Sequence, residues 1–144
     1  MRHIKTLLDG LTFAEGPRWH DNRLWFSDFY SHEVIRVDMD GNRETVTTVL
    51  QQPSGLGWMP NGELLVVSMR DQKLMRFGAE GLTEHADLSR FSRHWCNDMV
   101  VDTEGGAYVG NFGYNHYEEP VEKTANLARV DPDGSVHCAA TGLR

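Results

Sequence analysis

The sequence lacks any surplus of positive charge. It holds 14 lysines and arginines against 21 aspartates and glutamates, which gives a formal net charge of −7. A nucleic-acid-binding protein needs a basic stripe that offsets phosphate charge, so we expect no nucleic-acid partner. An acidic balance is compatible with cation binding, but it is usually only a solubility feature, and we interpret it in that way.

The sequence is also poor in long apolar segments. No apolar run approaches the length of a membrane span, and the residues after Met1 lack the apolar core of a signal peptide. No Asn-x-Ser/Thr acceptor for glycosylation occurs. We therefore expect a soluble, cytoplasmic protein with no membrane partner, an expectation that a leader missing from this sequence would overturn.

Cysteine is scarce as well. The two cysteines, Cys96 and Cys138, form no Cys-x-x-Cys pair, which argues against a structural zinc site. We expect two buried free thiols, and a single disulfide is the alternative. Sequence motifs for a nucleophile elbow and for a complete EF-hand loop are missing too.

What the sequence does contain is a repeat. Three related segments, at 16–28, 55–68 and 98–111, recur about every 40 residues, and each consists of two β-rich runs separated by a polar turn. Each segment is followed by a run that carries Arg36, Arg76 or Arg129 and that ends in an acidic-glycine turn. Glycine tolerates the positive φ that hairpin turns need, so each unit is predicted to form four short strands.

Four strands in about 40 residues are typical of one blade of a β-propeller. We predict an all-β fold of about three four-stranded blades, approximately at 11–50, 51–92 and 93–144. Propellers close with about four to eight blades, so we expect these three to be part of a longer protein, with a dimer of two such chains as the alternative. Residues 3–8 are predicted to form a strand that completes the last blade, and the open blade edges are predicted to favour self-association.

The third unit is about ten residues longer than the other two between its second and third strands. The additional residues include the polar and aromatic run at 114–120. Long loops on a rigid repeat scaffold are often functional, and a tolerated surface insertion is an equally good alternative.

Two places in the sequence are candidates for chemistry. Glu15 and the pair Asn97-Asp98 stand where the first strands of the first and third units begin. In a propeller these strand entrances ring the central channel, where a carboxylate can supply oxygen to a hard cation. On spacing alone, a solvated turn at Glu15 and a capped turn at Asn97 are the better alternatives.

The same segments resemble the senescence marker protein and gluconolactonase family. The matching motifs are Phe13–Trp19, Pro53–Trp58, Cys96–Asp102 and Tyr108–Gly113, in family order over essentially the whole chain. The resemblance implies a six-bladed propeller, of which this chain is the N-terminal half. It also implies one divalent cation in the channel, most often calcium, and hydrolysis of sugar lactones and related lactones.

The resemblance implies roles for individual residues. Glu15 would be a metal ligand, and Asn97 would contact the substrate or water held by the metal. The insert after Asn111 would be the loop over the channel mouth. Some members carry an arginine two residues before the Asn97 position, where this sequence has Trp95. The family's remaining ligands, an Asn and an Asp that is the usual general base, come from later blades, so no catalytic residue is identified in this chain.

A lactone is a cyclic ester, and its hydrolysis passes through an oxyanion that a divalent cation can stabilise. A carboxylate base would take a proton from the attacking water. Calcium prefers about six to eight oxygen ligands, more than Glu15 and Asn97 can supply. We therefore predict a metal-dependent, gluconolactonase-type lactone hydrolase whose isolated N-terminal half is inactive. A non-catalytic propeller binding module and a related metal-dependent propeller esterase are the alternatives.

Overall fold

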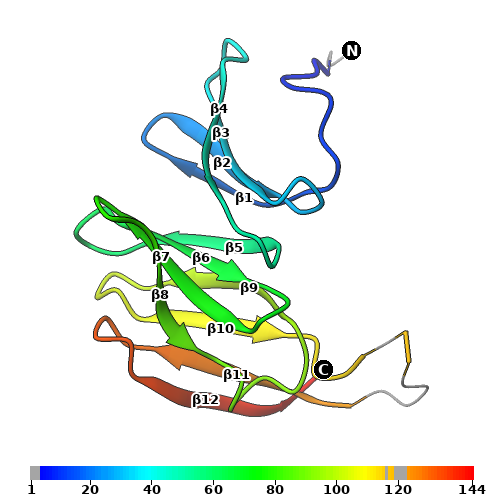
Figure 1. Ribbon diagram of the computed structural model, residues 1–144, viewed down its shortest axis with the longest axis vertical. Helices are drawn as coiled ribbons and strands as arrows, with labels where there is room; N and C mark the ends of the chain where they lie inside the picture. Colours follow the sequence, from blue (N-terminus) through cyan, green and yellow to red (C-terminus); the bar gives the residue numbers. More distant parts are fainter. Residues whose placement is uncertain (1–3, 116, 119–122) are drawn as a thin grey trace.

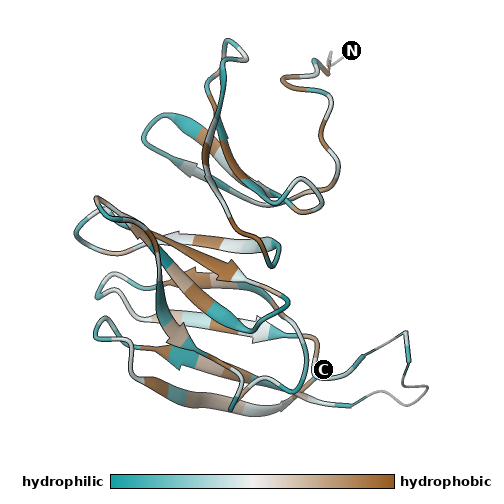
Figure 2. Ribbon diagram, viewed as in Figure 1, coloured by the Kyte–Doolittle hydropathy of each residue, from teal (hydrophilic) through white to brown (hydrophobic). Residues whose placement is uncertain are grey.

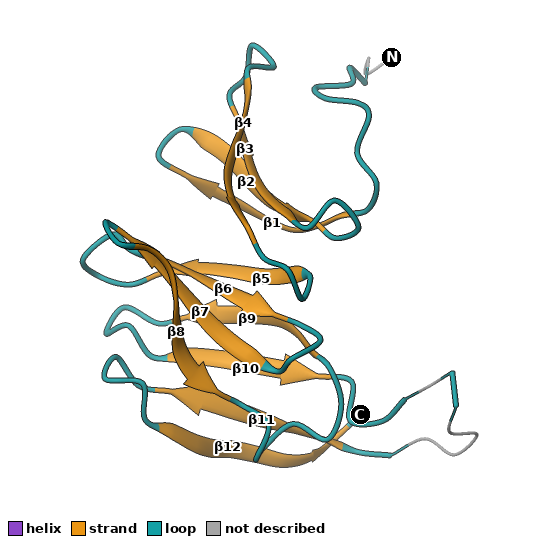
Figure 3. Ribbon diagram, viewed as in Figure 1, coloured by secondary structure: helices purple, strands orange, loops and turns teal. Residues whose placement is uncertain are grey.

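The computed structural model describes residues 4–115, 117–118 and 123–144 of the chain. Over these residues the chain forms strands joined by turns and loops, without a helix (Figure 3). The first sheet contains β1 (Ala14–His20), β2 (Arg23–Asp28), β3 (Glu33–Val37) and β4 (Arg43–Thr48). The second sheet contains β5 (Pro53–Trp58), β6 (Leu64–Ser68), β7 (Lys73–Gly78) and β8 (Gly81–Asp87). The third sheet contains β9 (Cys96–Val101), β10 (Ala107–Asn111), β11 (Ala125–Val130) and β12 (Val136–Leu143).

Each sheet is an antiparallel meander whose four strands pair in chain order, and the sheets follow one another along the chain (Figure 1). Gly41 and Gly134 have φ of 89° and 87° in the turns before β4 and β12, as the acidic-glycine motifs predicted. The prediction of an all-β fold with three four-stranded units is confirmed. In the described part of the chain, no helix long and apolar enough to cross a membrane is present.

The second sheet is covered by a neighbouring sheet on each face. All of strand β6 is buried. Leu64 and Val66 join an apolar cluster with the first sheet, whereas Leu65 and Val67 join another with the third sheet. Because successive strand residues point to opposite faces, this continuous apolar run contributes to both interfaces. Figure 2 colours the strands of the three sheets by residue hydropathy. The sheets therefore stack face to face in chain order.

The outer face of the first sheet is covered by the N-terminal segment. Phe26, Ile35 and Val37 are buried there against three leucines of residues 7–11. Residues 4–13 form no strand, so the strand predicted at 3–8 is absent over its described residues, while residue 3 lies outside them. A strand needs a neighbouring strand for its hydrogen bonds, and none pairs with this segment among the described residues. Its pairing with a later blade stays a prediction.

The first strands of the three sheets, β1, β5 and β9, converge, because β5 lies between the other two and contacts both. Gly55 in β5 marks the closest approach. A Cβ atom at Gly55 would lie 2.5 Å from the backbone nitrogen of Met99 in β9. Only glycine fits there, and its absent side chain lets the beginnings of the three strands meet.

The two cysteines differ in their surroundings. Both are free thiols, so the alternative of a disulfide is excluded, and Cys96 is buried as predicted. Cys138 is exposed on β12, which corrects the prediction of a second buried thiol. Strand β12 is at the edge of its sheet, where one long side lacks a neighbouring strand among the described residues.

Candidate functional site

A one-residue bulge interrupts each of the three first strands near its beginning. In β1 the register shifts between Glu15 and Arg18. In β5 it shifts between Pro53 and Leu56, and in β9 between residues 96 and 99. Bulges re-aim side chains and are frequent beside functional sites. The bulges thus give Glu15, and the residues at 54–55 and 97–98, an orientation that a regular strand would not allow.

Glu15 is a half-buried carboxylate at the first of these bulges. Its Oε1 atom is buried and has no hydrogen-bond partner among the described residues. Burial raises the pKa of Glu15 above its ordinary value, the nearby Ser54 hydroxyl lowers it in part, and the negative charge of Asp98 raises it further. An unpartnered, desolvated carboxylate oxygen is costly unless a positive charge or a donor reaches it.

Asn97 is brought to the same place from the third sheet. The hydroxyl of Ser54 donates a hydrogen bond of 3.0 Å to Oδ1 of Asn97. The backbone oxygen of Ser54 in turn accepts a hydrogen bond of 2.6 Å from the hydroxyl of Ser27, the residue paired with Glu15. A polar chain therefore joins the three sheets at the two predicted site residues, and Ser54 is its centre.

A second connection crosses from the first sheet to the third. Nη2 of Arg18 lies 2.6 Å from Oδ1 of Asp98 and donates a hydrogen bond of 2.8 Å to the backbone oxygen of Met99. The ion pair is partly exposed, so its contribution to stability is small. Its consequence is geometric, because it ties β1 to β9 beside Asn97.

Glu15 and Asn97 line one pocket of about 490 Å³, which we call the Glu15 pocket. Its walls come from the beginnings of β1, β5 and β9 and from the loops that follow β2, β6 and β10. Besides the two predicted residues, it is lined by Phe13, Phe29, Tyr30, Gln52, Met69, Arg70, Trp95, Phe112 and Tyr117. The sequence analysis missed most of these residues, although their equivalent positions in the repeat could have revealed them.

The insert between β10 and β11 reaches this pocket through Tyr117. That this insert forms a loop over the channel mouth stays a prediction. His116 and residues 119–122 of the insert lie outside the described residues.

Asp28 anchors the segment that leads into Glu15. The Asp28 carboxylate is buried at the end of β2. It accepts hydrogen bonds from the backbone nitrogen of Phe13 at 2.6 Å, from the Thr12 hydroxyl at 2.7 Å and from the Ser31 hydroxyl at 2.9 Å. Burial by itself would raise the pKa of Asp28, but these hydrogen bonds outweigh it and hold the pKa below its ordinary value.

The described residues fit a hard divalent cation in part. Glu15 offers a buried carboxylate oxygen without a partner among the described residues, and Asn97 offers an amide oxygen in the same pocket. Oxygen donors of these two kinds suit calcium. No group of three or more His, Cys, Asp or Glu side chains able to hold a metal occurs among the described residues. This chain would therefore supply only part of a coordination sphere.

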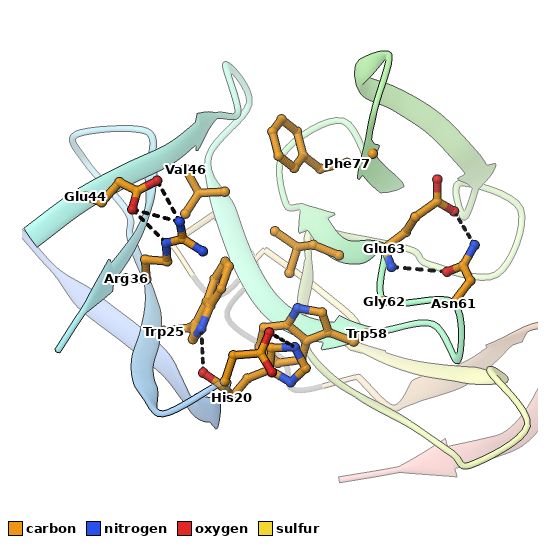
Figure 4. Close-up of a pocket in the computed structure, with 13 residues that line it drawn as sticks. His20, Trp25, Arg36, Glu44, Val46, Trp58, Asn61, Gly62, Glu63 and Phe77 are labelled. Atoms are coloured by element: carbon orange, nitrogen blue, oxygen red, sulfur yellow. Dashed lines mark hydrogen bonds and ion pairs between the residues drawn. The ribbon is translucent and has the colours of Figure 1, made fainter.

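A second pocket, of about 460 Å³, lies between the first two sheets at their opposite end (Figure 4). The imidazole of His20 stacks on Trp58 with ring centroids 3.9 Å apart, and Trp25 meets Trp58 edge-on at 5.3 Å. Arg36 is engaged by two hydrogen bonds to Glu44. These side chains satisfy one another, and neither Glu15 nor Asn97 is among the residues that line this pocket.

Comparison with known families gives one match. Residues 13–144 match the family described as SMP-30/Gluconolactonase/LRE-like region. No curated protein matches the sequence.

Several solved structures share the fold. A gluconolactonase from Xanthomonas campestris superposes with a TM-score of 0.71 at 19% identity, over 94% of this chain and 50% of that chain. Regucalcin from Agrobacterium tumefaciens, described as a calcium-binding protein, gives a TM-score of 0.69 at 18% identity. The match covers 92% of this chain and 44% of the regucalcin chain. A streptogramin B lyase gives a TM-score of 0.62 at 12% identity, and the match covers 85% of this chain and 38% of the lyase chain. The chain thus spans about half the length of the solved structures that it matches.

Proposed function

This chain belongs to the SMP-30/gluconolactonase/LRE-like family, and from that premise we propose that it forms part of the active site of a metal-dependent lactone hydrolase. One observation carries the proposal. The buried Oε1 of Glu15 has no hydrogen-bond partner among the described residues and lines the same pocket as Asn97. A cation at this place would remove the cost of the desolvated carboxylate.

Each of the two residues has a distinct part in the proposal. Glu15 would bind the cation through its carboxylate. Asn97, held by Ser54, would orient the lactone or a water molecule through its amide group. When bound, a divalent cation would polarise the lactone carbonyl and favour ionisation of water. No residue of this chain is assigned as the general base.

Calcium is the cation that we propose, because the candidate ligand Glu15 is an oxygen donor and because calcium accepts irregular coordination. The regucalcin structure, which shares the fold, is described as calcium-binding and supports this choice. Glu15 and Asn97 fill only part of a sphere of about six to eight ligands. We therefore expect the 144-residue chain to have no lactonase activity by itself.

Calcium titration combined with thermal unfolding tests the metal site. We expect calcium to raise the melting temperature of the chain, because a ligand that binds only the native state stabilises it. We expect Glu15→Gln to melt higher than the parent without calcium, since it removes a desolvated charge, and to lose the calcium effect. Glu104→Gln, at an exposed turn residue, is the matched control and should keep the calcium effect.

An equal calcium shift in Glu15→Gln and Glu104→Gln would rule out Glu15 as a ligand. Robust hydrolysis of gluconolactone by a monomer of this chain would contradict its expected inactivity. The fold alone does not fix the reaction, since a streptogramin B lyase shares it. Calcium binding without lactone hydrolysis once the ring is complete would favour a binding module instead.

A further inference from the structure

The Glu15 pocket has two aromatic walls, and we infer that it selects lactones that carry an aromatic group over polyhydroxylated sugar lactones. This inference rests on the proposed function, because it names the class of substrate for the same site. The described residues contribute six aromatic side chains to the pocket: Phe13, Phe29, Tyr30, Trp95, Phe112 and Tyr117.

The aromatic residues occupy equivalent positions in the repeat. In the first sheet the backbone nitrogen of Phe29 donates to the backbone oxygen of Phe13 at 2.9 Å. In the third sheet the nitrogen of Phe112 donates in the same way to Trp95 at 3.1 Å. The second sheet has the equivalent pair at positions 52 and 69, which are glutamine and methionine. The first and third sheets therefore each place an aromatic pair at the same end of the molecule.

The wall from the first sheet is a preformed cluster. Ring centroids of Phe13 and Phe29 lie 5.8 Å apart, those of Phe13 and Tyr30 lie 5.9 Å apart, and those of Phe29 and Tyr30 lie 5.0 Å apart. Phe13 is nevertheless 53% exposed and Tyr30 is 61% exposed. Rings that are held by one another and still face solvent offer an apolar surface that an aromatic ligand can cover with little loss of side-chain entropy.

The wall from the third sheet includes the indole ring of Trp95. Trp95 stands two residues before Asn97, so its indole borders the place where the lactone would be oriented. The guanidinium carbon of Arg70 lies 4.9 Å from the Trp95 ring centroid and comes from the loop after β6. The indole is thus fixed by a cation–π contact from the neighbouring sheet.

The pocket walls that the described residues supply carry few polar groups for a sugar lactone. Almost every carbon of a sugar lactone bears a hydroxyl group, and each hydroxyl that is buried without a partner costs free energy. Glu15 is assigned to the cation, and the side-chain oxygen of Asn97 already accepts a hydrogen bond from Ser54. Apart from the tyrosine hydroxyls, the indole N–H of Trp95 and the amide nitrogen of Asn97, only Gln52 and Arg70 remain as polar groups on the described walls. The aromatic surface suits the flat, apolar part of an aryl lactone instead.

Isothermal titration of the 144-residue chain with two lactones tests the inference. Coumarin serves as the aryl lactone and freshly dissolved glucono-δ-lactone as the sugar lactone, each with calcium and with EDTA. We expect coumarin to bind at least about tenfold more tightly than gluconolactone. Tighter or equal binding of gluconolactone, or the absence of coumarin binding, would overturn the inference.

Variants of exposed rings locate the binding. Phe13→Ser and Tyr30→Ser should each weaken coumarin binding by about three- to tenfold. Trp19→Ser is the matched control, because Trp19 is a 58% exposed ring of the same sheet that does not line the pocket. Circular dichroism and melting curves first establish that each variant folds. An equal loss in Trp19→Ser and Tyr30→Ser would place coumarin elsewhere and refute the inference.

The two proposals fail in different ways. If calcium raises the melting temperature of the parent and of Glu15→Gln equally, the proposed metal site is contradicted, irrespective of the result for coumarin binding. Preference for gluconolactone in a chain whose calcium shift requires Glu15 contradicts only the aromatic substrate class. Coumarin selectivity that persists in EDTA supports the aromatic walls independently of the cation.

Discussion

The hydroxyl of Ser54 donates a hydrogen bond of 3.0 Å to Oδ1 of Asn97, and through it the second sheet fixes the orientation of the amide on the third. Ser54 is buried, and its backbone oxygen also accepts the hydroxyl of Ser27 from the first sheet. A serine that carries no predicted role therefore holds together the place where Glu15 and Asn97 meet.

Removing the Ser54 hydroxyl should destabilise the contact between the second and third sheets at Asn97. We expect Ser54→Ala to lower the free energy of unfolding by about 1–2 kcal/mol, because the half-buried Asn97 oxygen loses its donor. We also expect a smaller calcium shift, which thermal unfolding with and without calcium would measure. Thr48→Val removes an exposed hydroxyl and keeps the β-branched shape, so it should change stability by less than about 0.5 kcal/mol. A normal calcium shift in Ser54→Ala would show that Asn97 orientation does not matter for the metal.

Asp28 should contribute more to the free energy of unfolding than a carboxylate on the surface does. We expect Asp28→Asn to cost about 2–3 kcal/mol at pH 7, because the charged acceptor of the Thr12, Phe13 and Ser31 donors becomes a neutral amide. Urea unfolding measures the loss. Asp40→Asn, at an exposed turn, should stay within about 0.5 kcal/mol of the parent. Equal effects of the two substitutions would contradict the anchoring role of Asp28.

The same carboxylate makes stability depend on pH. The pKa of Asp28 in the folded chain lies below its ordinary value of 3.8, so its stabilisation is fully present above that value. It is lost as the pH falls through the lowered pKa of the folded state. The stability gap between the parent and Asp28→Asn should therefore close below about pH 4, in urea unfolding measured from pH 7 to pH 2. A gap that stays constant down to pH 2 would mean that the ionised form is not what the donors stabilise.

Gly55 should not tolerate a side chain. A Cβ there would lie 2.5 Å from the Met99 nitrogen, a backbone atom that cannot move aside without shifting β9. We expect Gly55→Ala to destabilise the chain by about 3 kcal/mol or more. In Gly110→Ala the nearest atom would lie 3.6 Å away, an ordinary contact, so a change of at most about 1 kcal/mol is expected. Denaturant unfolding compares the two, and similar small effects would show that the strands do not converge at Gly55.

The two thiols should differ in reactivity. Burial, reinforced by the carboxylates of Asp71 and Asp87 and opposed by a contact with Ser92, raises the pKa of Cys96 to about 11. Cys96 is also inaccessible, whereas Cys138 is exposed. Titration with a thiol reagent at neutral pH should therefore detect one rapid equivalent in the native chain and two in denaturant. Cys138→Ser should abolish the rapid equivalent, and a second rapid thiol in the native parent would contradict the burial of Cys96.

The fold was largely predictable because its signals are local. Recurring β-rich runs and acidic-glycine turns mark each unit, and the structure confirms the three four-stranded units. The prediction that failed, the burial of Cys138, concerns a partner distant in sequence. Cys138 lies on an edge strand that no sheet covers among the described residues, whereas the pairing of residues 3–8 with a later blade stays a prediction. Local pattern does not show whether a neighbouring sheet is present.

By itself the sequence determined the repeat, the strands and the two residues, Glu15 and Asn97, at equivalent strand entrances. Only the tertiary structure decided what meets them there. Ser54 reaches Asn97 and Arg70 reaches the ring of Trp95 because the sheets stack face to face and their first strands converge at Gly55. These contacts join residues of different sheets, and they depend on inter-sheet packing, which no local pattern along one strand encodes.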